Sequence, residues 1–460
     1  MSKLTRRQIL RGAATVGMGA VGAGLLAACQ SAPTPAPAAA PKPAEPAAKP
    51  NAPASNAELK LQASVVPLGL MAIEFGKRFQ QDKGIKVTVE ETIYAEIEQK
   101  TQTGFISGTL QDVVYGHHRW LFTNFLKGIY LAIDNYLKSS PPENYADIFP
   151  SVMASNSLDG KNFSLPDVVH PGGNIAVSYN KNILKEKGLA EPKAGWTFDD
   201  WTKLARAAAD PKKGIFGMTL EGDNSLHYYS NISRSFGEKA GRDGWLLDEE
   251  GKKISFNSAM HKEVGEWYAQ LKADKIATRI ADLIDKQSVN VFTAGLAATH
   301  GGTVNSVATA LAKTAGKFDM DAVLLPVGPK GRQGTCYSGN QWMINAKTKY
   351  PAESWELLKY LASTEAGVYL VTEGKVQPNG RKSAWADPRV TKVNRMFGIA
   401  TDLIVAGVEK FPMPNNTRFT EANNAFAAEV DQIWEGGKKW ADHAPEVDKK
   451  VQAILDLARP

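Results

Sequence analysis

The stretches LKLQASVV (59–66), GIKVTVEE (84–91) and QDVVYG (111–116) decide the fold that this sequence predicts. The first alternates apolar and polar side chains, which is typical of a strand, and the other two are predicted as strands by the same rules. Each of the two gaps is long enough for one helix. A strand–helix–strand–helix–strand order predicts an α/β fold, with parallel strands and with helices on the faces of the sheet.

Helical spacing fills the gaps between these strands. Met71, Phe75 and Phe79 recur every four residues as one apolar stripe, and Gly84 marks the end of that helix. A second helix is expected over about residues 95–106. Late in the chain, the same spacing predicts two more helices, at Trp355, Leu358 and Leu361 and at Phe426, Val430 and Ile433. No internal repeat of solenoid period is present.

One helix start can be read directly from its capping residues. The Thr197 hydroxyl can cap a helix, and Asp199 and Asp200 follow it at the positive end of the helix dipole. DPKKG (210–214) predicts a turn after that helix. These features are interpreted as structural, without a part in ligand binding.

The chain begins with the pattern of an export signal. In TRRQILRGAATVGMGAVGAGLLAAC, which ends at Cys29, Arg6 and Arg7 precede a glycine-rich apolar run (12–26). A secretory signal has these regions in this order, and the twin arginine points to the bacterial Tat route. A permanent membrane helix is the alternative, but the run is shorter than the roughly 20 residues that a bilayer span needs. Residues 1–28 are therefore predicted to be a Tat-type signal peptide.

The end of this signal resembles the lipobox of bacterial lipoproteins, because LAAC places small residues before Cys29. In such proteins the cysteine is acylated and becomes the first mature residue. The resemblance implies lipidation at Cys29 and a protein anchored on the outer face of the cytoplasmic membrane, at the cell surface or in the periplasm; an incidental thiol is the alternative. From residue 31 to residue 57 no aromatic or large aliphatic residue occurs, so residues 29–57 are predicted to be an extended Pro/Ala-rich tether.

The composition fits a soluble globular protein. About 400 residues follow the tether, which is enough for two or three domains, and 43% of the chain is hydrophobic and 22% charged. Four basic residues and no acidic ones precede Cys29, which lowers the formal charge from +6 to +2 in the remainder and gives no support for nucleic-acid binding. With Cys29 lipidated, Cys336 has no partner for a disulfide framework or a cysteine-based metal site.

A series of motifs in one order resembles the extracellular solute-binding proteins of ABC sugar importers, the family that includes maltose-binding protein. The resemblance covers residues 59–460. The motifs, in chain order, are GIKVTVEE, SGTLQDVVYG, LKGIYLAIDNYL, DGKNFSLP, AVSYNKNILKEKGL, GWTFDDWTKLARAAADPKKGIFGM, FNSAMHKEVGEWYAQL, VFTAGLAATHGG, VLLPVGPKGR and GNQWMINAKTKYPAESWELLKYLAS.

The resemblance implies a two-lobed periplasmic-binding-protein fold of type II. Each lobe is a sheet flanked by helices, and the ligand lies in the cleft between the lobes. Open α/β sheets bind ligands at the carboxyl ends of their strands, so the loops that follow strands are the candidate site. The implied domains are lobe one, 58–165 plus 327–364, and lobe two, 170–324 plus 368–460.

The first candidate segment follows the strand in QDVVYG. A sugar site needs stacked aromatic rings and convergent hydrogen-bonding groups. The spacing from Asp112 to Gly128 matches a loop of maltose-binding protein that supplies an aromatic residue, an acid and an arginine, although no acid is present here. A metal site at the adjacent histidines is not expected, because successive side chains point apart. The predicted ligand contacts are His117, His118, Arg119 and Trp120; the alternative is that Trp120 is core and the histidines a solvated helix start.

Two further segments belong to lobe two. EGDNSLHYY (221–229) follows the strand IFGMTL, with a surface loop and a buried tyrosine as the alternative. HGGT (300–303) follows AGLAAT, where glycine allows a ligand to approach the backbone and the next helix supplies amide donors. The predicted contacts here are Asn224, Tyr228, Gly301, Gly302 and Thr303.

The fourth segment, SGNQW (338–342), precedes the strand MINA. Its amides and indole fit sugar chemistry, and the predicted contacts are Asn340, Gln341 and Trp342, with a core role as the alternative for Trp342. HPGGN (170–174) lies at the first crossing between lobes, where glycines suit the torsion changes of closure and Asn174 is a further predicted contact. Residues 67–70 are a weaker candidate, and Arg381 is expected to be structural.

The leading interpretation is a monomeric binding protein without cofactor or metal. It captures a carbohydrate, expected to be an oligosaccharide, between its lobes and delivers it unaltered to the transmembrane subunits of an ABC permease. One alternative keeps the fold and changes the cargo to a polyol, a glycerol phosphate or a peptide. The other is a surface glycosidase, which needs two carboxylates across a cleft. Glu221 and Asp223 are the only close acid pair in the candidate loops, so the chain is not predicted to be an enzyme.

Overall fold

The computed structural model describes residues 56–65, 68–154, 156–170, 176–222, 224–238, 244–248, 250–334, 338–399 and 416–457. All of them belong to one compact unit, residues 48–460. The predicted signal peptide, Cys29 and nearly all of the tether lie outside the described residues. Within the described part of the chain, no helix is both long and apolar enough to cross a bilayer.

The stretches that decide the fold form the first sheet, as predicted. The strands β1 (Glu58–Ser64), β2 (Lys86–Thr92) and β3 (Val113–His117) pair in parallel. The predicted helices between them are α2 (Leu70–Lys83) and α3 (Ile97–Ser107). Met71, Phe75 and Phe79 are buried against the sheet. Gly84 ends α2 in the left-handed region, with φ 69°, where a residue without Cβ is favoured.

Two strands from later in the chain complete this sheet and make it mixed rather than wholly parallel. The order is β2-β1-β3-β11-β6, with β11 (Ser338–Ile344) antiparallel to both β3 and β6 (Leu165–His170). Helix α13 (Pro351–Leu361) packs on the same face as α2. Smaller elements complete the first half: η1 (Tyr94–Glu96), α4 (His118–Leu126), α5 (Asp134–Ser139), η2 (Tyr145–Asp147), α6 (Pro150–Ala154), β4 (Ser157–Leu158) and β5 (Lys161–Asn162).

A second sheet has the order β10-β7-β9-β8, formed by Met320–Leu324, Ala176–Asn180, Ala297–Gly302 and Phe216–Leu220. β8 and β9 are parallel, and the other pairs are antiparallel. Thr197 caps α8 through a capping box with Asp200, as expected. The helices of this half are α7 (Lys181–Glu186), α8 (Phe198–Ala208), α9 (Leu226–Phe236), α10 (Ala259–Ala273), η3 (Ile280–Asp282), α11 (Ser288–Thr293), α12 (Val304–Thr314), α18 (Phe419–Trp434) and α19 (Trp440–Leu455).

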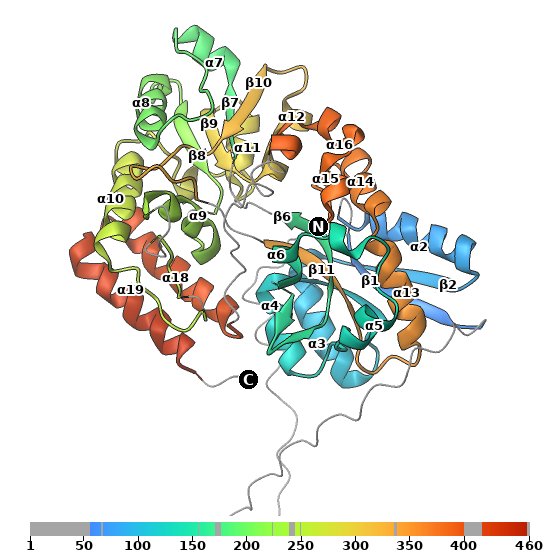
Figure 1. Ribbon diagram of the computed structural model, residues 1–460. Helices are drawn as coiled ribbons and strands as arrows, with labels where there is room; N and C mark the ends of the chain where they lie inside the picture. Colours follow the sequence, from blue (N-terminus) through green and yellow to red (C-terminus); the bar gives the residue numbers. More distant parts are fainter. Residues whose placement is uncertain are drawn as a thin grey trace, which may run out of the picture. The chain divides into compact units, whose positions relative to one another are not determined.

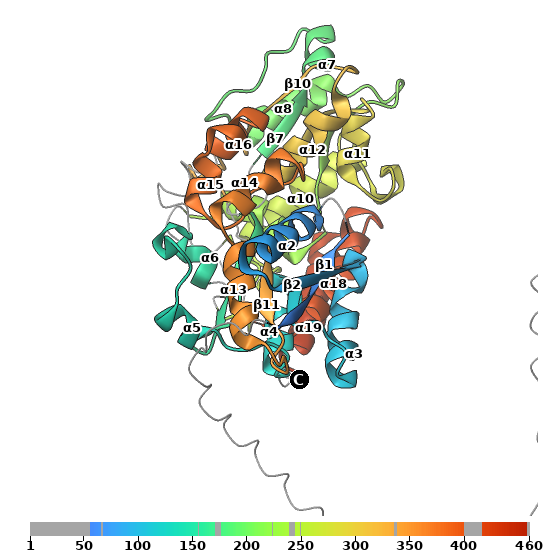
Figure 2. The ribbon, with the colours of Figure 1, turned by 90° about the vertical axis from the view of Figure 1, so that its right-hand side faces the viewer.

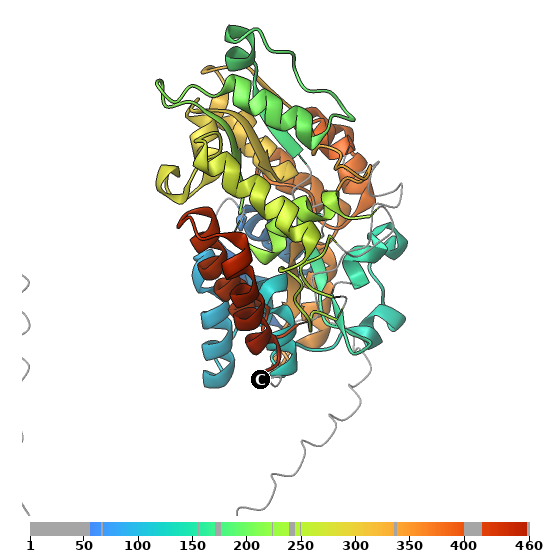
Figure 3. The same ribbon diagram turned by 90° about the vertical axis from the view of Figure 1, so that its left-hand side faces the viewer.

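The carboxy-terminal helices α18 and α19 pack in the core of the second half, beside α10 (Figure 3). Three shorter helices, α14 (Thr364–Thr372), α15 (Lys382–Ala386) and α16 (Pro388–Val393), lie between α2 of the first half and α12 of the second (Figures 1 and 2). Their buried side chains share one apolar cluster with residues of both halves, including Val169 and Val304. This cluster makes the three helices the connection between the two sheets.

Three segments expected to be loops at strand ends lie within strands. His117, just past the predicted strand QDVVYG, belongs to β3; residues 300–302 belong to β9; and the segment from Ser338 onward belongs to β11. In each case the strand continues because its backbone groups pair with a neighbouring strand; Gly301, for example, lies opposite both Val177 and Leu220. The candidate side chains therefore sit within strand ends, on the last residues of β3 and β9 and on the first residues of β11.

Candidate ligand-binding site

An aromatic cluster lies at the carboxyl ends of β2 and β3. The ring of His117 lies 5.4 Å from that of Trp120 and 5.9 Å from that of Tyr94, and Tyr94 lies 5.9 Å from Trp120, measured between centroids. His118 lies 3.7 Å from His117. The structure thus brings together three predicted residues and adds Tyr94, which the sequence reasoning missed. The available signal was its position in η1, directly after the strand β2.

Hydrogen bonds and burial fix this cluster. The Gly339 amide donates to His118 Nδ1 at 3.1 Å, which ties the start of α4 to β11. His117, His118 and Trp120 are all buried, whereas Tyr94 is half-buried. Tyr94 is therefore the ring of this cluster that is most open to a ligand. The backbone of Arg119 lies in α4, and its side chain lies outside the described residues.

The predicted amide residues lie on the adjacent strand β11. Asn340 pairs with His117 across the sheet and is 5% exposed, and Gln341 is fully buried. Trp342 is also fully buried and packs edge-on against Tyr115, with ring centroids 5.1 Å apart. The expectation that Trp342 contacts ligand is therefore corrected to the core role, because its position opposite Tyr115 encloses the indole.

In the second half, the loop after β8 is held by α18. Asn224 donates to both carboxylate oxygens of Asp431, at 3.1 and 3.0 Å. The Ser225 hydroxyl and the Leu226 amide both donate to Asn423 Oδ1 at 3.1 Å. These bonds join residues about 200 positions apart in the sequence, so α18 determines where this loop lies. The Tyr228 side chain and Asn174, both predicted contacts, lie outside the described residues.

Glu221, also on this loop, connects it to the start of α12. The Thr303 amide and the Ser306 hydroxyl donate to Glu221 Oε2. Thr303 itself caps α12 by accepting the Ser306 amide at 3.0 Å. Burial raises the pKa of Glu221, whereas these two donors lower it. Thr303 is thus engaged within the protein as a helix cap.

Packing within the protein explains why β9 has glycine at positions 301 and 302. A Cβ on Gly301 would lie 2.8 Å from both Leu220 and Trp201. A Cβ on Gly302 would lie within 2.8 Å of His300 Nε2, Glu221 Oε2 and Ser306 Oγ. The proposed reason for these glycines, close approach by a ligand, is therefore replaced by close packing of side chains on both faces of β9.

Helix α18 also reaches the first half. The Thr123 hydroxyl of α4 donates to the Thr417 carbonyl, just before α18 begins, and the two helices are in contact. The same helix holds the loop at Asn224 through Asp431. The segment that includes α18 therefore contacts both the element that carries Trp120 and the loop that carries Asn224.

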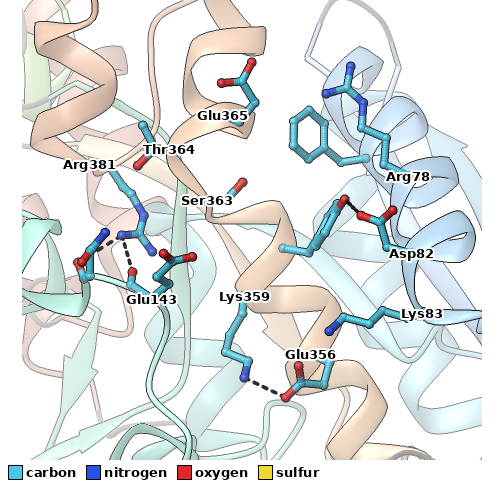
Figure 4. A pocket seen from close by; sticks show the side chains of 13 residues that line it. Arg78, Asp82, Lys83, Glu143, Glu356, Lys359, Ser363, Thr364, Glu365 and Arg381 are labelled. Carbon is cyan, nitrogen blue, oxygen red and sulfur yellow. Dashed lines mark hydrogen bonds and ion pairs between the residues drawn. The ribbon is translucent and has the colours of Figure 1, made fainter.

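The grooves of the described residues include two of similar volume. One, of about 720 Å³, is formed by the loop at Glu221 and Asn224 together with residues 278–288 and Lys272. The other, of about 710 Å³, lies on the first half between α2, α13 and α14 (Figure 4). It contains none of the predicted ligand contacts. Among its charged side chains, Lys359 pairs with Glu356 (Figure 4), and Asp82 accepts a hydrogen bond from the Tyr360 hydroxyl.

Two mixed sheets with helices on their faces, joined by a shared helical connection, define a two-lobed binding protein. The family model for bacterial extracellular solute-binding proteins matches residues 74–396, and the chain belongs to this family. Relatives include a probable ABC transporter-binding protein of Deinococcus radiodurans, 23% identical over 310 residues, which covers 64% of this chain and 70% of the relative. A putative binding protein of Brucella abortus is 23% identical over 295 residues, covering 63% and 67%.

Solved structures support the same fold. An ABC substrate-binding protein of Listeria monocytogenes in complex with cycloalternan superposes with a TM-score of 0.74 at 14% identity, covering 88% of this chain and all of that one. A Mycobacterium tuberculosis protein in complex with glycerophosphocholine gives 0.73 at 18% identity, covering 87% and 99%. At these identities the likeness establishes the two-lobed periplasmic-binding-protein fold. The family and these neighbours consist of solute-binding proteins rather than enzymes.

Proposed function

We propose that this protein is the lipid-anchored substrate-binding component of an ABC importer, and that it captures a carbohydrate and delivers it to the permease. The observation that carries the proposal is the aromatic cluster of Tyr94, His117 and Trp120 at the carboxyl ends of β2 and β3, beside the amide of Asn340. Stacked rings next to planar amide groups are what sugar faces and hydroxyls require. Sugars bound by structural neighbours, such as cycloalternan and maltose, are consistent with this class of cargo.

The proposed mechanism of ligand capture is closure of the two lobes. We propose lobe one as residues 58–165 plus 327–364 and lobe two as 170–324 plus 368–460, with the helices α14 to α16 forming the connection that both lobes share. A ligand that contacts both lobes stabilises the closed state and shifts the population toward it. The cargo is not altered, and the monomer suffices. The proposed contacts are Tyr94, His117, His118, Arg119, Trp120 and Asn340 from lobe one and Asn174, Asn224 and Tyr228 from lobe two, with Gly301, Gly302, Thr303 and Gln341 supporting them.

A thermal-shift panel tests the cargo. The Cys29→Ser protein is screened against mono- and oligosaccharides, polyols, glycerophosphodiesters and peptides, because a ligand that binds only the folded state raises the melting temperature. We expect shifts from sugars, and we expect Tyr94→Ala to weaken the best sugar about tenfold, the loss of roughly one stacked ring. Tyr350→Ala is the control, since Tyr350 is equally half-buried in the same core but lies before α13. Shifts from peptides alone would overturn the assignment.

The lipid anchor has a test of its own. Acyl chains contribute about 0.8 kcal/mol per buried CH₂, so two or more chains hold a protein on a membrane. We expect Cys29→Ser to move the protein from the membrane pellet to the soluble fraction after high-speed centrifugation of lysed cells. Cys336→Ser, the only other cysteine substitution available, should leave the protein in the pellet. A Cys29→Ser protein that stays in the pellet contradicts lipidation.

A further inference from the structure

A polar cluster is buried beside the aromatic cluster, on the same sheet. It consists of Asp167 on β6, Tyr115 on β3, and Asn340 and Trp342 on β11, each at most 5% exposed. Trp342 lies opposite Tyr115. The regular pairing of β6 with β11 is interrupted between Gly339 and Gln341. Asp167 lies opposite this irregularity, next to Asn340 on the neighbouring strand.

The polar atoms of this cluster are short of partners. Among the described residues, no hydrogen bond of normal geometry reaches either oxygen of Asp167, Oδ1 of Asn340 or the Tyr115 hydroxyl. The Trp342 indole and the Val168 amide face the Asp167 carboxyl, and the Asn340 side chain faces Tyr115. A buried polar group without a partner destabilises a fold by roughly 1–3 kcal/mol, and natural proteins retain several together where they serve a purpose.

Charge in the cluster is also unbalanced. Asp167 takes part in no ion pair with another described residue, and a buried carboxylate is normally paired with a cation. Burial raises the pKa of Asp167 to about 7, and the titratable side chain that interacts with it is Tyr115. No described charged side chain of the packed elements β11, α13 or α14 offsets this effect. No cationic side chain among the described residues therefore lies beside the Asp167 carboxyl.

We infer that Asp167, Asn340 and Tyr115 form a subsite for a protonated amine, and that the cargo is an amine-bearing sugar or polyol. The inference rests on the proposed solute-binding function. Three side chains here offer acceptor oxygens, and an ammonium group donates three hydrogen bonds, whereas a sugar hydroxyl donates one.

The direct test uses methylammonium chloride as the probe, with sodium chloride at the same concentration as the control for ionic strength. We expect methylammonium to raise the melting temperature of the Cys29→Ser protein. The same measurement compares glucosamine with glucose and galactosamine with galactose, with a preference for the amine in at least one pair. Asp167→Asn, which keeps the shape and removes the charge, should weaken amine binding at least tenfold and leave the affinity for neutral sugars within about twofold.

Two readouts separate binding from a structural role. Because Asp167→Asn removes an unpaired buried carboxylate, the melting temperature of the ligand-free variant at pH 8 should be equal to or above that of the parent. Tyr115→Phe, which retains the ring, serves as a second variant that should weaken methylammonium binding several-fold. Methylammonium affinity should rise from pH 6 to pH 8 as Asp167 ionises, and should be flat in Asp167→Asn.

The outcomes distinguish this inference from the proposed function. Neutral sugars that bind while amines show no preference, or an amine response that Asp167→Asn preserves, would overturn the subsite and leave sugar binding intact. Methylammonium affinity that falls with rising pH would also overturn it, because the cation would then bind the protonated carboxyl of Asp167 better than the ionised one. If no sugar, polyol or amine binds at any pH, the proposed function itself fails.

Discussion

Arg381→Met should lower the free energy of unfolding by about 3–5 kcal/mol. Arg381 is 3% exposed, and its guanidinium donates to the carbonyl oxygens of Ala362 at 2.7 Å, Glu143 at 2.7 Å and Asn144 at 3.1 Å (Figure 4). Methionine fills a similar volume but leaves these three carbonyls without their donor. These contacts support the structural role that the sequence predicts for Arg381.

Urea unfolding, followed by tryptophan fluorescence, measures this effect. The matched control is Arg389→Met, the same substitution at a residue of the neighbouring helix α16 whose side chain is 53% exposed. Arg389 forms ion pairs with Glu365 and Asp387, and exposed pairs contribute about 1 kcal/mol or less. A loss at Arg381 no greater than that at Arg389 would show that the buried guanidinium is not needed.

Gly217→Ala should prevent lobe two from folding properly, with a destabilisation above about 4 kcal/mol. A Cβ at Gly217 would lie 2.0 Å from the carbonyl oxygen of Ala205 and 2.8 Å from its Cα, all backbone atoms of α8. The helix cannot move away easily, because the Trp201 indole donates to the Thr299 hydroxyl, which in turn donates to the Gly217 carbonyl, both at 2.9 Å. The clash therefore either breaks this chain of hydrogen bonds or displaces β8.

Soluble yield and the melting temperature measured by circular dichroism report this effect. Gly398→Ala is the control, since the nearest atom to a Cβ there is a Thr391 methyl carbon at 3.4 Å. That variant should express and melt like the parent. A Gly217→Ala protein that also melted within about 2 °C of the parent would mean that α8 and β8 are not as closely packed as described.

Local signals predict several elements of the fold. The period-two and period-four patterns identified β1, β2, α2 and α3, and Thr197 marked the start of α8. From the sequence, Gly301 and Gly302 are expected to let a ligand approach the backbone, whereas in space Leu220, Trp201 and His300 leave no room for a Cβ at these positions. That requirement comes from residues far away in the chain, which no local window contains.

The candidate site was predicted less completely for the same reason. Trp342 was interpreted as a ligand contact, and its burial follows only from pairing with Tyr115, more than 200 positions earlier. Asp167 could not be predicted from the sequence, because a single acidic residue in a strand forms no pattern. Its burial depends on Asn340 and Trp342, which lie on the neighbouring strand across the β-bulge. Tyr94, in contrast, follows closely after the strand β2. The rule that predicted His117, that ligand contacts come at the carboxyl ends of strands, therefore also applies to Tyr94.

The position of β11 has a consequence for biosynthesis. This strand lies between β3 and β6 in the first sheet, yet residues 171–337, which include all strands of the second sheet, precede it in the chain. Until residue 344 leaves the ribosome, β3 and β6 each present an open edge, and such edges invite pairing with other chains. We therefore expect nascent chains that stop before β11 to depend on chaperones and to aggregate when released, even though the whole second sheet has already been synthesised.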